Sequence, residues 1–223
     1  MIRGTLSSLV VCLTPLVVCL TPARAAEKNG AVNGIVKVRG VTTAEAAPVV
    51  LYLTGFTEEP DKASARITQR DKKFVPDVMP ITVGQTVDFA NEDTIWHNVF
   101  SISKARAFDL GMTKKPDTKA ITFTKTGVID VYCNIHPEMV GTVLVLPNRA
   151  FAIADKDGRY RIQNVPPGDY KMFAWSKRSD VQSKPVTVTA GEPLKVDWEV
   201  VQDKVPDKHK DKYGKDYKGG AKY

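Results

Sequence analysis

Cysteine and histidine are both scarce in this chain. Its 223 residues contain three of each. Cys12 and Cys19 lie in an apolar run near the N-terminus, so Cys133 is the only cysteine in the rest of the chain. A single thiol excludes an intramolecular disulfide there, and the lack of a C-x-x-C-H pattern excludes covalent attachment of haem.

Helical periodicity is also largely missing. Apolar and polar residues instead alternate in short runs, as at residues 36–38, 87–89 and 170–174. A period of two is typical of half-buried strands, and Pro-Gly and Asp-Gly pairs separate these runs as turns would. The sequence therefore predicts an all-β protein built of sandwiches.

The chain has only one long apolar run, from Leu6 to Leu20. It follows the basic segment Met1–Arg3 and precedes an A-x-A pattern at residues 23–25. This order is typical of a secretory signal peptide and not of a membrane span. We therefore expect residues 1–25 to be removed, the mature chain to lack a transmembrane segment, and the protein to reside in the periplasm.

Acidic residues are outnumbered by basic ones. The formal net charge is +7, and removal of Arg3 and Arg24 would lower it by two. This excess favours an anionic partner, although we expect no nucleic acid. Residues 202–223 are rich in lysine and glycine and have few apolar side chains, so we expect a disordered basic tail in which His209 has no role. The alternative is that this tail tethers the protein to an acidic surface or partner.

Sulfur and imidazole groups are gathered on one short segment. Cys133, His136 and Met139 form the pattern C-x-x-H-x-x-M. Two histidines, one cysteine and a distant axial methionine make a blue-copper electron-transfer site. The second histidine must come from elsewhere, and His97 is the candidate because His209 lies in the polar tail. The sequence thus predicts one copper ion bound by His97, Cys133, His136 and Met139.

Two separated motifs carry a resemblance to a known family. Residues 91–99 read N-x-x-x-x-x-H-N-V, and residues 127–139 read G-x-x-x-x-Y-C-x-x-H-P-x-M. Their order and context are similar to those of the cupredoxins, and within them to the amicyanin and plastocyanin families. The resemblance implies a Greek-key β-sandwich over residues 60–147 that carries one type 1 copper.

The resemblance also implies roles for residues around the ligands. Asn98 matches a position whose side chain ties the two ligand loops together in cupredoxins. His136 would reach the surface through an apolar patch, where a redox partner docks. Asn134 replaces the usual Thr or Ser, Ile135 the usual Pro, and Trp96 another Pro, which bears on the tuning of the potential. A basic rim around the patch would be formed by Lys104, Arg106, Lys114 and Lys115.

The segments that flank this sandwich carry a second resemblance, to carboxypeptidase regulatory-like, or prealbumin-like, domains. The similar strands are at residues 30–38, 47–55, 154–170 and 186–200. Residues 149–201 alone are few for a sandwich without disulfides. We therefore predict a second small β-sandwich that is discontinuous, formed by residues 26–59 and 148–201, with the cupredoxin inserted into it.

The C-x-x-H-x-x-M segment has two other interpretations. One is a buried thiol beside a core histidine, and another is structural zinc, which accepts cysteine and histidine. The thioether of Met139 argues against zinc. Three histidines also leave too few for the second copper of a multicopper oxidase or copper nitrite reductase, and the predicted site has no open coordination position. We therefore expect that the protein is not an enzyme.

The function that these patterns favour is the transfer of single electrons between redox partners in the cell envelope. A c-type cytochrome or a dehydrogenase, acidic at its docking surface, is the expected kind of partner. Two alternatives remain open. One is a copper-binding or copper-delivery protein with no electron-transfer role, and the other is a partner-binding module with an incidental copper site.

Overall fold

The computed structural model describes residues 29–42, 45–204 and 209–217. These residues form seventeen β-strands, β1 to β17, and no helix, so the all-β prediction is confirmed. Consequently, no described segment is a helix long and apolar enough to cross a membrane. The predicted signal peptide lies outside the described residues.

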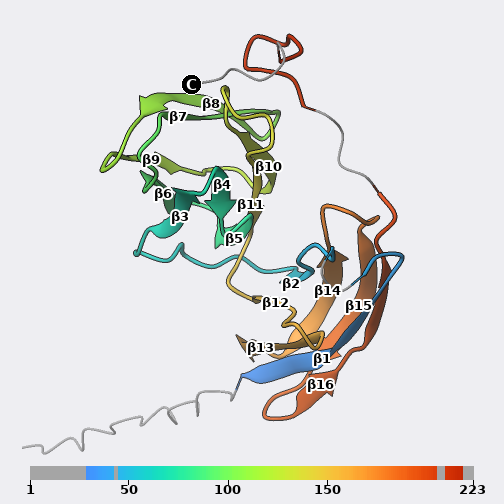
Figure 1. Cartoon of the computed structure of the whole chain (residues 1–223). Coiled ribbons are helices and arrows are strands. Elements are labelled where there is room, and N and C mark those ends of the chain that lie inside the picture. The colour runs from blue at the N-terminus through green and yellow to red at the C-terminus, as the bar shows by residue number, and fades with distance from the viewer. Residues whose placement is uncertain (1–28, 43–44, 205–208, 218–223) are drawn as a thin grey trace, which may run out of the picture.

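Two sandwiches lie next to each other (Figure 1). The first, drawn from cyan to yellow-green, has one sheet in the order β5-β11-β10-β7-β8 and another in the order β4-β3-β6-β9. Its strands are β3 (Ala65–Arg70), β4 (Lys73–Val75), β5 (Val78–Thr82), β6 (Thr86–Asn91), β7 (His97–Ser103), β8 (Arg106–Thr113), β9 (Thr118–Thr122), β10 (Gly127–Tyr132) and β11 (Val140–Leu146).

Strand β10 shows how the sequence pattern builds this core. Ile129 and Val131 are buried, whereas Val128 is exposed and Asp130 is half-buried. Alternate side chains of a strand point to opposite faces, so Cys133, which follows the strand, continues the inward set. Cys133 accordingly belongs to the same buried apolar cluster as Ile129 and Val131.

The second sandwich contains the first two strands and the last six. Its strands are β1 (Gly30–Arg39), β2 (Val50–Thr54), β12 (Phe151–Ile153), β13 (Arg159–Val165), β14 (Gly168–Trp175), β15 (Gln182–Val188), β16 (Pro193–Lys195) and β17 (Trp198–Val201). Strand β1 pairs with β13, β16 and β17, and β2 pairs with β12 and β14. Strands that precede the first sandwich in the sequence thus pair with strands that follow it, as a discontinuous domain requires. The predicted domain boundaries themselves stay a prediction.

An apolar cluster joins the two sandwiches. Val78, Leu144 and Leu146 of β5 and β11 pack with Val50 of β2 and with Trp175, the last residue of β14. Beside this cluster, the Lys177 ammonium lies 2.7 Å from the Asp77 carboxylate, which links the same two parts of the chain. The cluster buries apolar area that either sandwich alone would expose to water, so each sandwich stabilises the other.

We expect Trp175→Ala to lower the free energy of unfolding by about 3 kcal/mol, because the indole is 8% exposed and its removal leaves a cavity between the sandwiches. Urea unfolding followed by circular dichroism measures this loss, and the transitions of the two sandwiches should separate. Trp96→Ala is the matched control, since that ring is 50% exposed and lies outside the cluster. Equal losses in both variants would contradict this account of the contact.

Candidate metal centre

Three potential metal donors converge at one end of the first sandwich. His97 is the first residue of β7, and Cys133 follows β10, which pairs with β7 through Tyr132 and Phe100. His136 lies in the loop between β10 and β11. Hydrogen bonds from the Cys133 N–H to the Met139 carbonyl (3.2 Å) and from the Met139 N–H to the His136 carbonyl (3.0 Å) fold this ligand loop, residues 133–139, back on itself.

The donor atoms are spaced as a three-coordinate metal requires. The Cys133 Sγ lies 3.9 Å from the Nδ1 of His97 and 3.6 Å from the Nδ1 of His136, and the two nitrogens are 3.1 Å apart. Metal bonds of about 2.0 Å to nitrogen and about 2.3 Å to sulfur, arranged trigonally, would put the donors about 3.5 to 3.8 Å apart. The cluster therefore fits a metal ion, and no second such cluster was found among the described residues.

Met139, the predicted axial ligand, is fully buried and belongs to the same apolar cluster as Cys133. The structure therefore brings all four predicted ligands into one region. The donor atoms of His97, Cys133 and His136 lie close to one another, and Met139 packs in the same cluster as Cys133. Their roles as ligands stay a prediction. A thiolate, two imidazoles and a thioether are a donor set that copper prefers to harder cations such as Mg²⁺.

Burial sets the protonation of the metal-free site. It raises the pKa of the Cys133 thiol, although the backbone N–H groups of Asn98, Ile135 and His136 favour the thiolate. Burial also lowers the pKa of His136, and the neighbouring His97 acts in the same direction. A neutral imidazole has a free lone pair for a metal, whereas the thiol must lose its proton when a metal binds.

Asp93 orients His97 and was missed in the sequence. Its Oδ2 lies 2.7 Å from the Nε2 of His97, and its carboxylate also accepts the backbone N–H groups of Asp71 and Lys72. Burial acts to raise the pKa of Asp93, but the hydrogen bonds from Lys72 and His97 hold it below its usual range. An ionised Asp93 accepts the Nε2 proton and leaves Nδ1 free to bind a metal. The only signal in the sequence was a carboxylate four residues before His97.

Asp93→Asn should weaken copper binding about tenfold, because the loss of a carboxylate behind a ligating histidine typically has an effect of this size. Competition with a chelator of known affinity measures it. Asp88→Asn is the control, since this half-buried carboxylate lies on β6 of the same sandwich, away from the donor cluster. If the two variants bind copper equally well, Asp93 does not orient His97.

Asn98 differs from its expected role. Its side chain donates to the Asp109 carboxylate (2.7 Å) and to the Gly111 carbonyl (2.9 Å), both on β8. Among the residues that the structure describes, its buried Oδ1 finds no hydrogen-bond partner. The side chain therefore fixes β8 beside β7, and the link to Cys133 runs through the Asn98 backbone N–H. The bulge between Asn98 and Phe100 in the β7–β8 register accompanies this arrangement.

His136 borders an apolar cavity at the surface. The cavity has a volume of about 400 Å³. Its lining consists of Lys72, Thr94, Ile95, Trp96, Met112, Ile135 and His136. Trp96 and Met112 are about half exposed. Exposed apolar surface often marks an interaction site, and here it lies beside a predicted ligand.

The structure places one residue of the predicted basic rim beside the cavity and two residues away from it. The Lys114 ammonium lies 5.9 Å from the centre of the Trp96 ring, beside the cavity. Lys104 and Arg106, however, lie at the β7–β8 turn, because Ser103 pairs with Arg106 while His97 pairs with Thr113 at the other end of the hairpin. Six residues of strand put that turn about 20 Å from His97.

The C-terminal segment also differs from the expected free tail. Residues 209–217 lie against the ligand loop, where the His209 ring stacks on Tyr132 with centroids 4.1 Å apart. The His209 Nε2 is 2.7 Å from the Pro137 carbonyl oxygen. Composition could not predict this, because the contacts are aromatic and polar and need no aliphatic burial. Residues 205–208 and 218–223 lie outside the described part of the chain.

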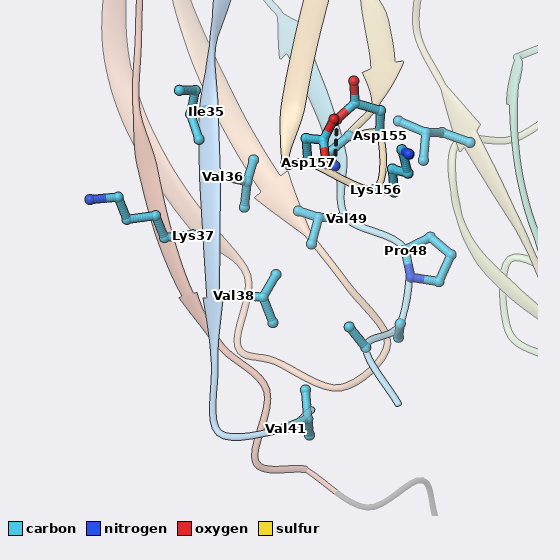
Figure 2. Close-up of a pocket in the computed structure, with 15 residues that line it drawn as sticks. Ile35, Val36, Lys37, Val38, Val41, Pro48, Val49, Asp155, Lys156 and Asp157 are labelled. Atoms are coloured by element: carbon cyan, nitrogen blue, oxygen red, sulfur yellow. Dashed lines mark hydrogen bonds between the residues drawn. The ribbon is translucent and has the colours of Figure 1, made fainter. Parts of the chain in front are cut away.

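A second cavity, of about 570 Å³, lies in the other sandwich between β1 and residues 153–158 (Figure 2). Its wall is both apolar and polar, and Val36 and Val38 of β1 face Val49 across it. The Asp155 carboxylate accepts the N–H groups of Asp157 and Arg159, so it holds the turn together. This cavity adds no cluster of metal donors.

Comparison with known proteins agrees with this geometry. Residues 62–146 match the family of copper binding proteins, plastocyanin/azurin family. Amicyanin of Paracoccus versutus is 36% identical over 76 residues, which are 33% of this chain and 58% of that protein. The match thus spans less than two thirds of the length of this relative.

Similar solved structures cover the same region. A reduced mutant of amicyanin is 26% identical, covering 43% of this chain and 98% of its own, with a TM-score of 0.36. A novel purple cupredoxin from Nitrosopumilus maritimus is 28% identical, covering 37% of this chain and 100% of its own, with a TM-score of 0.35.

The first sandwich therefore has the sequence and the donor cluster of a copper-binding protein. More particularly, residues 62–146 resemble the plastocyanin/azurin family, and the region is similar to amicyanin. The second sandwich is β-structured, but residues 151–196 match polysaccharide lyase family 4, domain II. Its prealbumin-like character is thus not confirmed.

Proposed function

We propose that this protein carries single electrons through one type 1 copper bound by His97, Cys133, His136 and Met139. The observation that carries the proposal is a buried sulfur and imidazole cluster whose one half-exposed member, His136, borders an apolar surface. The buried donors would hold the metal away from water. His136 would provide the short path to a partner.

The surroundings of the ligands favour electron transfer. Asp93 fixes the His97 ring, and backbone N–H groups surround the Cys133 sulfur. Ligands held in this way need little rearrangement when a bound metal changes charge. Four protein donors also leave no open position for a substrate, which supports a carrier and not an enzyme.

Copper delivery is the weaker candidate. His97, Cys133 and Met139 are all fully buried. A protein that hands its metal to a target needs donors that the target can reach, and only His136 is partly accessible. The buried donors therefore favour a resident metal over a transferred one.

Voltammetry of the copper-loaded protein tests this function. We expect a reversible one-electron wave, and Met139→Leu should keep the copper but shift the wave, because the axial ligand tunes the potential. Met79→Leu is the matched control, since Met79 lies on β5 outside the predicted ligand set. Absence of a reversible wave in a copper-loaded parent would rule out the electron carrier.

The apolar cavity beside His136, with Lys114 next to its Trp96 ring and Lys115 following in the chain, suits brief docking of an acidic redox protein such as a c-type cytochrome or a dehydrogenase. An apolar centre permits close approach, and the lysines would raise the association rate at low salt. Weak redox encounters need only a small interface. The half-exposed Trp96 provides the largest ring of this surface.

Lys114→Glu with Lys115→Glu should slow electron transfer to an acidic envelope cytochrome and remove its dependence on ionic strength. Stopped-flow measurements at several salt concentrations show both effects. Lys104→Glu with Arg106→Glu is matched in charge and lies at the far turn of the hairpin, so it should have a smaller effect. Equal slowing in both double variants would show that net charge, and not this surface, governs docking.

The location and the second sandwich complete the proposal. We propose that the leader at residues 1–25 exports the chain to the periplasm. N-terminal sequencing of the periplasmic protein should then find Ala26 as the first residue, and retention of Met1 would contradict export.

We also propose that the second sandwich is a prealbumin-like module. The pairing of β1 and β2 with later strands supports an inserted cupredoxin.

A further inference from the structure

Residues 209–217 form a segment that we call the C-terminal strap. Besides its His209 contacts, the strap reaches the ligand loop at two other points. The Tyr217 hydroxyl donates to the Cys133 carbonyl at 2.9 Å. The Lys212 backbone N–H donates to the Asn134 Oδ1 at 2.9 Å. Three residues of the ligand loop, Cys133, Asn134 and Pro137, are thus hydrogen-bonded to the strap.

The strap also reaches the other ligand-bearing hairpin. The Lys212 ammonium lies 2.7 Å from Oδ2 of Asp109, whose Oδ1 accepts the Asn98 side chain. Asn98 follows His97 on β7. One residue of the strap, Lys212, therefore connects the ligand loop with the strand pair that carries His97.

The strap leaves the proposed docking surface open. None of the residues that line the cavity beside His136 belongs to it. Its contacts are instead with the Tyr132 ring, with the side chains of Asn134 and Asp109, and with backbone carbonyls of the loop. Such contacts constrain the shape of the loop and do not block a partner.

The strap also accounts for a residue that departs from the cupredoxin pattern. Asn134 stands where those families usually have Thr or Ser, and its amide oxygen is the acceptor for the strap at Lys212. A hydroxyl on the shorter side chain of serine would fall short of this N–H. The asparagine at position 134 is thus explained by its hydrogen bond to the strap.

We propose that the C-terminal strap is a positioning element that holds residues 133–137 in the shape needed for metal binding. Because the strap fixes the loop beforehand, it lowers the entropy that the loop must lose when a metal binds. The consequence for copper rests on the proposed function. The hold on the loop itself does not, because none of the strap's contacts uses a donor atom of the predicted site.

The test uses full-length protein with Cys12→Ser and Cys19→Ser, so that Cys133 is the only thiol. In the copper-free protein, the rate at which an aromatic disulfide reagent modifies Cys133 reports opening of the loop. Tyr217→Phe should raise this rate about three- to tenfold, because the loss of one hydrogen bond typically shifts the opening equilibrium of a loop by a factor of this size. Tyr213→Phe is the matched control and should leave it unchanged, since Tyr213 is 71% exposed.

A second set of variants separates positioning from general stability. Truncation after Lys204 should raise the rate at least as much as Tyr217→Phe, and Asn134→Ser should raise it in the full chain but add nothing in the truncated one. The unfolding midpoint of the sandwiches should stay constant. In copper-loaded protein, truncation should speed Cu(I) loss to a chelator and shift the sulfur-to-copper absorption band.

The results distinguish this proposal from the proposed function. Parental modification rates in the truncated and Tyr217→Phe proteins would overturn the strap, whether or not copper binds. Faster modification of Cys133 in a protein that never binds copper would support the strap and reject the electron carrier. Additive effects of Asn134→Ser and truncation would show that Asn134 acts independently of the strap.

Discussion

The whole molecule depends on keeping one thiol and two imidazoles close together inside an apolar core. Unpaired polar groups are costly to bury, and each donor here has a neighbour that offsets the cost. Asp93 accepts from His97, and backbone N–H groups surround the Cys133 sulfur. A bound metal would complete these interactions. The donors are therefore arranged to receive a metal.

The rest of the chain supports this cluster from three sides. The five-stranded sheet brings β7 and β10 together, so that donors far apart in the sequence meet at one end. The second sandwich packs through Trp175 against β5 and β11 of the same sheet. The C-terminal strap holds the ligand loop from outside. Each support leaves the surface around Trp96 and His136 accessible to a partner.

The sequence predicted those features that depend on local pattern. Alternating side chains predicted the strands, and the spacing of Cys133 and His136 predicted two donors on one loop. His97 followed from its motif and from the scarcity of histidine. These features depend on strand periodicity and on the short reach of a loop, so neighbouring residues suffice to define them.

Features that depend on distant contacts could not be predicted in this way. The Asn98 side chain bonds to β8 beside a bulge in the strand pairing, and the direction of the β7–β8 hairpin carries Lys104 and Arg106 away from the site. The strap was missed because composition measures apolar content, whereas His209 and Tyr217 are held by stacking and hydrogen bonds.

One measurement tests the central claim most directly: the visible absorption and electron paramagnetic resonance spectra of the protein loaded with one equivalent of Cu(II). The account predicts an intense sulfur-to-copper charge-transfer band and the narrow copper hyperfine splitting of a type 1 site, both absent in Cys133→Ala. A weak absorption with the wide hyperfine splitting of a tetragonal nitrogen and oxygen site, or a band that survives in Cys133→Ala, would contradict it.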